Sequence, residues 1–88
     1  MKATQMANNQ IIIQSHDGQY FQSYDSIIAY RDVDGQLTLD RDNWNYSKTT
    51  AKYRNLFTGL TTKATLSAIS AGTIKLEDLN NESKADAK

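Results

Sequence analysis

Residues 44–59 read Trp44-Asn45-Tyr46-Ser47-Lys48-Thr49-Thr50-Ala51-Lys52-Tyr53-Arg54-Asn55-Leu56-Phe57-Thr58-Gly59, and this stretch decides the fold. Wound as a helix at about 100° per residue, it separates into two sides. One side carries Tyr46, Thr49, Tyr53, Leu56, Phe57 and Leu60. The other carries Lys48, Ala51, Lys52 and Asn55, with Arg54 on the flank. The sequence therefore predicts an amphipathic helix with a cationic polar side, capped by Asn45 or Ser47 and ended by Gly59.

Four strands are predicted before this helix. The β-branched run at 10–14 is the clearest, and residues 19–22, 27–31 and 36–40 follow it. Asp17-Gly18 and Asp34-Gly35 predict hairpins, because Asp-Gly favours a type I′ turn, in which both central residues have positive φ. These segments predict an antiparallel meander without a long crossover connection.

A second helix is predicted over residues 63–71, with Thr61 or Thr62 as its cap and Gly72 as its end. Residues 73–77 alternate and predict a last strand. The predicted fold class is therefore α+β: an antiparallel β-meander of about four to five strands with two helices packed on one face. We expect a disordered N-terminus (1–9), a single domain (10–79) and a disordered tail (80–88).

The predicted core joins the helix to the sheet. It sets four helix-region side chains (Trp44, Tyr53, Leu56 and Phe57) against Ile12, Ile28, Leu37 and Leu39. A chain of 88 residues can bury only a small core, so each of these large side chains matters to its stability.

Composition argues against most catalytic chemistry. There is no Cys and a single His, so no thiolate nucleophile, zinc site or His-activated nucleophile is expected. Residues 32–40 begin like a calcium loop, but Tyr30 and Arg41 stand where two decisive ligands belong. We expect no catalytic residue, metal or cofactor, and we predict that the protein is not an enzyme. Without an apolar span or signal sequence, the expected location is the cytoplasm.

Charge is segregated along the chain although the formal net charge is +0. Residues 16–42 hold six Asp against Arg31 and Arg41, whereas residues 43–76 are basic and lack acids. Such segregation bears on partners rather than on fold. The candidate partner-binding residues are Lys48, Lys52, Arg54 and Asn55. They fit an acidic host protein surface or, as the alternative, nucleic acid bound by the basic helix 48–58.

Several motifs resemble a group of short uncharacterised proteins encoded by bacteriophages. They are Tyr24-Asp25-Ser26-Ile27-Ile28-Ala29, Leu37-Thr38-Leu39-Asp40, Trp44, Tyr46-Ser47-x-Thr49-Thr50-x-Lys52-Tyr53-Arg54-Asn55-x-Phe57 and Leu76-x-x-Leu79-Asn80. The resemblance brings no assigned activity, but it implies a context in the cytoplasm of a host cell. By analogy with anti-CRISPR proteins, it implies a small non-enzymatic inhibitor that binds and inhibits or redirects a host protein or ribonucleoprotein complex.

Overall fold

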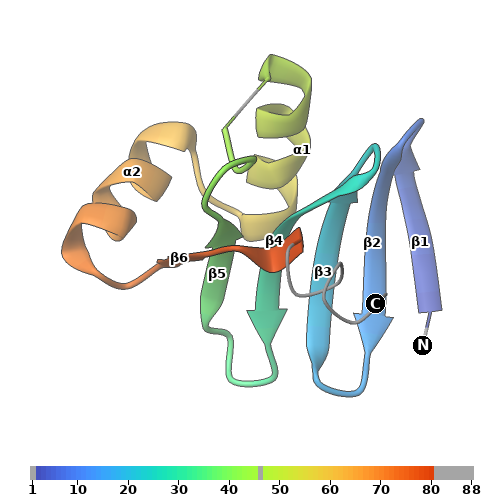
Figure 1. The fold of residues 1–88 in the computed structure, drawn as a ribbon, viewed down its shortest axis with the longest axis horizontal. Coiled ribbons are helices and arrows are strands. Elements are labelled where there is room, and N and C mark those ends of the chain that lie inside the picture. The colour runs from blue at the N-terminus through green and yellow to red at the C-terminus, as the bar shows by residue number, and fades with distance from the viewer. Residues whose placement is uncertain (1, 46, 81–88) are drawn as a thin grey trace.

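The computed structural model describes residues 2–45 and 47–80, which form a six-stranded sheet and two helices (Figure 1). The order along the chain is β1 (Lys2–Ala7), β2 (Gln10–Ser15), β3 (Gly18–Ser23), β4 (Ser26–Asp32), β5 (Leu37–Asp40), α1 (Lys48–Thr58), α2 (Thr62–Ala71) and β6 (Lys75–Glu77). Strands lie in the sheet in sequence order. The predicted α+β class is confirmed.

Strand β6 is the exception to the antiparallel meander. The pairs from β1 to β5 are antiparallel, whereas β6 lies parallel to β5, with Leu76 opposite Leu39. The parallel pairing follows from the connection, because α1 and α2 carry the chain back to the starting end of β5.

Strand β1 lies where the sequence predicts a disordered N-terminus (1–9), so that prediction is wrong for residues 2–7. Ala3 pairs with Ile13 and Gln5 with Ile11. The turn that joins the strands includes Asn9 at φ 64°, a left-handed conformation that Asn tolerates better than most residues. Polar β1 has no hydrophobic pattern of its own, and it is ordered by pairing with the strongly β-forming β2.

The β2–β3 turn differs from the predicted type I′ turn. Ser15 pairs with Gly18, which leaves His16 and Asp17 as the two turn residues. Among the described non-glycine residues, only Asn9 and Tyr24 have positive φ, so Asp17 does not adopt a type I′ position. Glycine is instead required at position 18 because β3 and β4 approach closely there. A Cβ there would lie 2.2 Å from the carbonyl oxygen of Arg31.

Both helices begin and end as the sequence predicts. Ser47 caps α1 by accepting a hydrogen bond from the backbone N–H of Thr50 at 3.1 Å, and Gly59 follows the helix at φ 77°. Thr61 caps α2 by accepting from the backbone N–H of Ala64 at 3.1 Å. Gly72 ends α2 in the left-handed conformation that favours glycine.

The core lies between the sheet and the two helices. Its buried hydrophobic residues are Phe21, Ile28, Ala29, Leu39, Phe57 and Ile74. Phe57 of α1 stacks on Phe21 of β3 with 5.9 Å between ring centroids, and α2 packs Ala68 and Ile69 against the same cluster. Both helices therefore cover one side of the sheet.

Helix α1 is rotated relative to the predicted side. Thr50, Arg54 and Phe57 are its buried residues, whereas Leu56 is 63% exposed, so the predicted burial of Leu56 is wrong. The cause is polar. Thr50 Oγ1 lies 2.9 Å from Ser23 Oγ in a buried hydrogen bond, and this contact turns Thr50 rather than Thr49 toward the sheet.

The end of the described chain is fastened by two side chains. Asp40 is buried, and its carboxylate accepts hydrogen bonds from the backbone N–H groups of Asn43 and Leu79. The Asn80 amide bonds to both backbone groups of Ile27, accepting at 2.7 Å and donating at 3.0 Å. Of the predicted disordered tail (80–88), Asn80 is thus ordered, and residues 81–88 lie outside the described residues.

Candidate functional site

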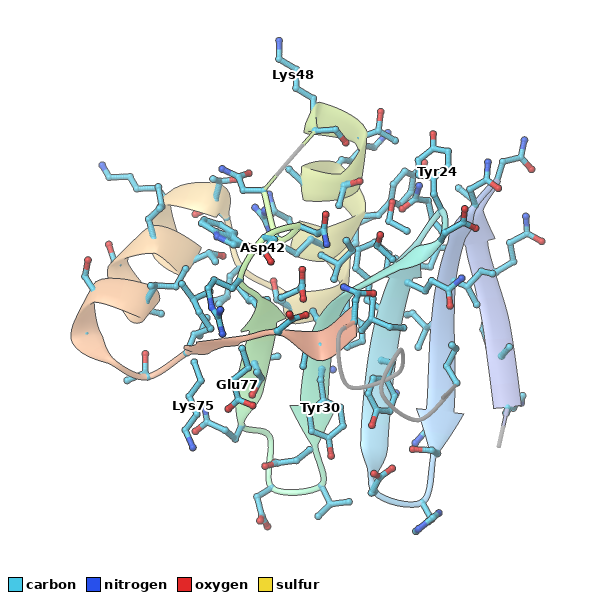
Figure 2. The ribbon with its side chains drawn as sticks, viewed as in Figure 1. Tyr24, Tyr30, Asp42, Lys48, Lys75 and Glu77 are labelled. Carbon is cyan, nitrogen blue, oxygen red and sulfur yellow. The ribbon has the colours of Figure 1, made fainter. Side chains whose placement is uncertain are left out.

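Two of the four predicted binding residues are exposed on α1. Lys48 begins the helix and its side chain points into solvent (Figure 2). Lys52 follows one turn later and is also exposed. The Lys52 ammonium lies 5.4 Å from the centroid of the Tyr53 ring, a cation–π distance that still leaves the charge at the surface. Both positions are thus exposed, and their part in binding stays a prediction.

Arg54 is buried, so the prediction that it contributes to the cationic surface is wrong. Its guanidinium donates to the carbonyl of Trp44 at 2.6 Å and to Thr62 Oγ1 at 2.9 Å, and it lies 5.0 Å from the Trp44 ring centroid. Burial lowers the pKa of Arg54. The planar fork of the guanidinium allows this placement, because it reaches several acceptors at once.

Asn55 is also a hydrogen-bond partner of the buried Arg54. Its Oδ1 accepts from Arg54 at 2.9 Å, and its Nδ2 donates to Thr62 Oγ1 at 3.3 Å. The predicted set of four is thereby divided into an exposed lysine pair and a structural pair that joins α1 to α2. The exposed face of α1 presents Lys48 and Lys52, with Leu56 beside Lys52 one helical turn on.

The opposite side of the sheet presents a different surface, which the sequence analysis did not single out. We call it the open face, defined by Ile11, Ile13, Tyr20, Ile27 and Tyr30. Ile11, Ile13, Tyr20 and Tyr30 alternate with Ile12, Phe21 and Ala29 in paired strands, so they point away from the helices. Ile27 joins them because a bulge in β4 pairs it with Gln22, which alternates with Phe21. All five remain partly exposed, and α1 and α2 pack on the other side of the sheet, against the cluster that contains Phe21 and Leu39.

Two tyrosines lie at the centre of the open face. Tyr20 and Tyr30 pair across β3 and β4, with ring centroids 4.6 Å apart. The Tyr30 hydroxyl donates to the backbone carbonyl of Asp17 at 2.6 Å. Burial raises the pKa of Tyr30, and the negative charges of Asp17 and Asp32 raise it further. This end of the open face is therefore acidic.

The signal for the open face was present in the sequence. Ile11-Ile12-Ile13 is apolar at consecutive positions, and a strand covered on one side only should alternate with polar residues. Such a run indicates apolar residues on both sides of the sheet. Sequence reasoning used it only as evidence for a strand.

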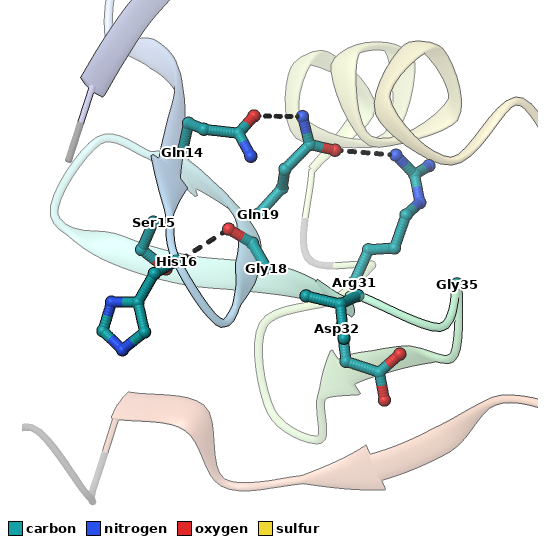
Figure 3. A pocket seen from close by; sticks show the side chains of 9 residues that line it. Gln14, Ser15, His16, Gly18, Gln19, Arg31, Asp32 and Gly35 are labelled. Carbon is teal, nitrogen blue, oxygen red and sulfur yellow. Dashed lines mark hydrogen bonds between the residues drawn. The ribbon is translucent and has the colours of Figure 1, made fainter.

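A pocket of about 350 Å³ lies between the tips of the β2–β3 and β4–β5 hairpins (Figure 3). Its polar groups are largely paired with one another. Gln19 donates to Gln14 at 2.7 Å and accepts from Arg31 at 3.0 Å, and Arg31 also donates to the carbonyl of Phe57. Arg31 thereby places a cation at the negative end of α1. The polar groups of the pocket therefore hold the two hairpins and α1 together.

Neither a metal site nor a membrane span is apparent in the described part of the chain. No group of three or more His, Cys, Asp or Glu side chains in residues 2–45 and 47–80 could hold a metal ion. No helix within those residues is long and apolar enough to cross a membrane.

Comparison with known proteins identifies a family. The model of DUF8033, a family of unknown function, matches residues 1–72, and the chain therefore belongs to this family. The matched range contains β1 to β5 and both helices. No curated protein and no solved structure matches the chain.

Proposed function

We propose that this family member is a non-enzymatic, phage-type protein that binds a host protein complex through its open face and inhibits or redirects that complex. The resemblance to short phage proteins supports the host context. The observation that carries the binding role is the open face itself, with three isoleucines and two tyrosines on a side of the sheet that no described helix covers.

A partly exposed apolar sheet face is physically suited to protein binding. Contiguous apolar surface is rare on soluble monomers and marks interaction sites. Tyrosine is enriched at interfaces, since it buries a large ring and keeps a polar group for hydrogen bonding. Hydrogen-bonded neighbours hold β2, β3 and β4 on both sides, so the surface is fixed in shape before it meets a partner.

The alternative, nucleic-acid binding by α1, has weaker support. With Arg54 inside and Asn55 bonded to it, the candidate residues supply two exposed charges, Lys48 and Lys52. Two phosphate contacts give little affinity at physiological salt. The non-enzymatic character is part of our proposal, and it is supported by the pocket, where the polar groups brace two hairpins rather than converge on an empty centre.

The test is affinity capture from a bacterial host lysate with two matched double variants. Ile11→Thr/Ile13→Thr makes the open face more polar and keeps β-branched residues in β2, so the strand should persist. Lys48→Gln/Lys52→Gln neutralises the exposed face of α1. Both proteins are first shown to be folded by circular dichroism.

We expect one host protein complex to be retained by the parent and by the lysine variant, with or without nuclease, and to be lost by the isoleucine variant. Capture that depends on the lysines and disappears with nuclease would reject the proposal and favour nucleic-acid binding. Equal capture by all three proteins would show that the partner contacts neither surface.

A further inference from the structure

Acidic residues border the open face at the hairpin end and along the β6 edge of the sheet. Asp17 is exposed, and its backbone carbonyl accepts the Tyr30 hydroxyl bond at 2.6 Å. Asp32 ends β4 at the same hairpin end. Glu77 is an exposed residue of β6 opposite Asp40, at the end of β5 away from the hairpins. Lys75 lies two positions before Glu77 on the same side of that strand (Figure 2). These borders thus hold three carboxylates and one ammonium, and the sum of these charges is negative.

The shape of the open face fits a helix. A sheet with helices on one side only is a two-layer fold, and a further helix layer is the common way to bury a second apolar side. Neighbouring strands lie about 4.8 Å apart, so β2 to β4 spans about 10 Å. This width equals the diameter of one α-helix with its side chains, about 10 Å.

The negative charge along the border of the open face favours some binding partners over others. Two copies of this chain that meet through their open faces would bring the Asp17 and Glu77 borders together, and like charges across an interface are unfavourable. Nucleic acid would bring phosphates to the same carboxylates. A cationic border on the partner is the complementary arrangement.

Building on the proposed docking through the open face, we infer that the host partner inserts an amphipathic helix, with an apolar stripe flanked by Lys or Arg, across β2, β3 and β4. The stripe would pack on Ile11, Ile13 and Tyr20. Its cations would reach Asp17 at the hairpin end and Glu77 at the β6 edge.

The inference is tested with two stapled helical peptides of about four turns. Both carry the same leucine stripe, and they differ only in having Lys or Glu on the flanks. Amide chemical-shift mapping on the full chain locates each peptide, and titrations give its affinity. We expect the Lys-flanked peptide to shift the amides of β2, β3 and β4 and to bind more tightly than the Glu-flanked peptide.

Charge-neutralising variants give matched controls. Asp17→Asn/Glu77→Gln should weaken the Lys-flanked peptide by about three- to thirtyfold, as expected for two exposed ion pairs. Asp25→Asn changes another exposed turn aspartate, at the opposite end of β4, and should leave the affinity unchanged.

Three results would overturn the inference: no binding of the Lys-flanked peptide at the open face, equal binding of the Glu-flanked peptide there, or occupation of that face by RNA or by a second copy of the chain. Capture by the Ile11→Thr/Ile13→Thr variant reports separately on the proposed function, because it depends on the open face but not on the partner's charge.

Discussion

Arg54 shows how far a single residue can depart from what its type predicts. An arginine in a lysine-bearing helix indicates a cationic surface, yet the guanidinium is fully buried beside Trp44 and bonded to Thr62 of α2. Helical periodicity gives the angular position of a side chain but not the acceptors that later parts of the chain bring to it. The placement of Arg54 therefore required the structure.

A conservative change at Arg54 should be costly. In Arg54→Lys, one ammonium cannot reach Trp44, Asn55 and Thr62 together, which leaves buried acceptors without donors. We expect a loss of about 2–3 kcal/mol in the free energy of unfolding, measured by urea denaturation. The exposed control Lys52→Gln should stay within about 0.5 kcal/mol of the parent. Equal stability of both variants would contradict the buried role of Arg54.

Tyr30 provides a pH-dependent signal from the open face. Burial, then Asp17 and Asp32, raises the pKa of Tyr30 above its ordinary value of 10.0, so the folded protein favours the neutral phenol. The resulting stability is fully present below pH 10 and is lost as pH rises through the folded pKa. The difference between the ultraviolet titrations of the parent and Tyr30→Phe should have its midpoint above 10.0. A midpoint at or below that value would mean that neither burial nor the neighbouring acids raise the pKa of Tyr30.

At the scale of elements, the ends of the two helices are easier to predict from sequence than the side of α1 that is buried. Ser47, Thr61, Gly59 and Gly72 bound the helices as expected, because capping is a local hydrogen-bond or backbone requirement that sequence displays. The buried side of α1 was predicted incorrectly, since Thr50 and Arg54 are turned inward by polar partners that hydrophobicity does not reveal.

Neighbouring residues of α1 test this orientation directly. Phe57 is 5% exposed and stacks on Phe21, whereas Leu56 is 63% exposed. Phe57→Ala should cost about 3–5 kcal/mol, a large share of the roughly 5–15 kcal/mol typical of a domain. Leu56→Ala should change the stability by less than about 0.5 kcal/mol. Similar melting temperatures for the two variants, measured by circular dichroism, would show that the helix is placed on the wrong side.

For the molecule as a whole, local sequence patterns predict the central strands of the sheet but not strand β1 or the contacts that hold the end of the described chain. Turn residues and β-branched runs identify β2 to β5, but β1 has no pattern of its own and is held by β2. The fastening of the described end depends on contacts across long stretches of chain, from Asp40 to Leu79 and from Ile27 to Asn80. Sequence offers no local signal for such contacts, and the open face was missed for a related reason. Knowing which sheet side the helices cover requires the assembled fold.

The arrangement of charge over the molecule leads to a prediction about nucleic acid. Lys48, Lys52 and Lys63 are exposed on the helices, whereas Asp17 and Glu77 border the opposite side. A nucleic acid could therefore approach only the helix layer, and α1 offers it two lysines. Each neutralised phosphate contributes about −0.9 to the slope of log affinity against log salt, so contacts by the two α1 lysines give a slope no steeper than roughly −2.

We expect titrations with DNA and RNA at two salt concentrations to show nothing tighter than the non-specific range of ~10⁻⁴–10⁻⁶ M. The comparison is between the parent and Lys48→Glu/Lys52→Glu, and Arg54 is left intact because it is buried and joins α1 to Thr62 of α2. Reversal of two surface charges should reduce even this weak binding while the melting temperature stays close to that of the parent. Tight, steeply salt-dependent binding by the parent that disappears in the variant would make nucleic acid the partner and remove the case for the open face.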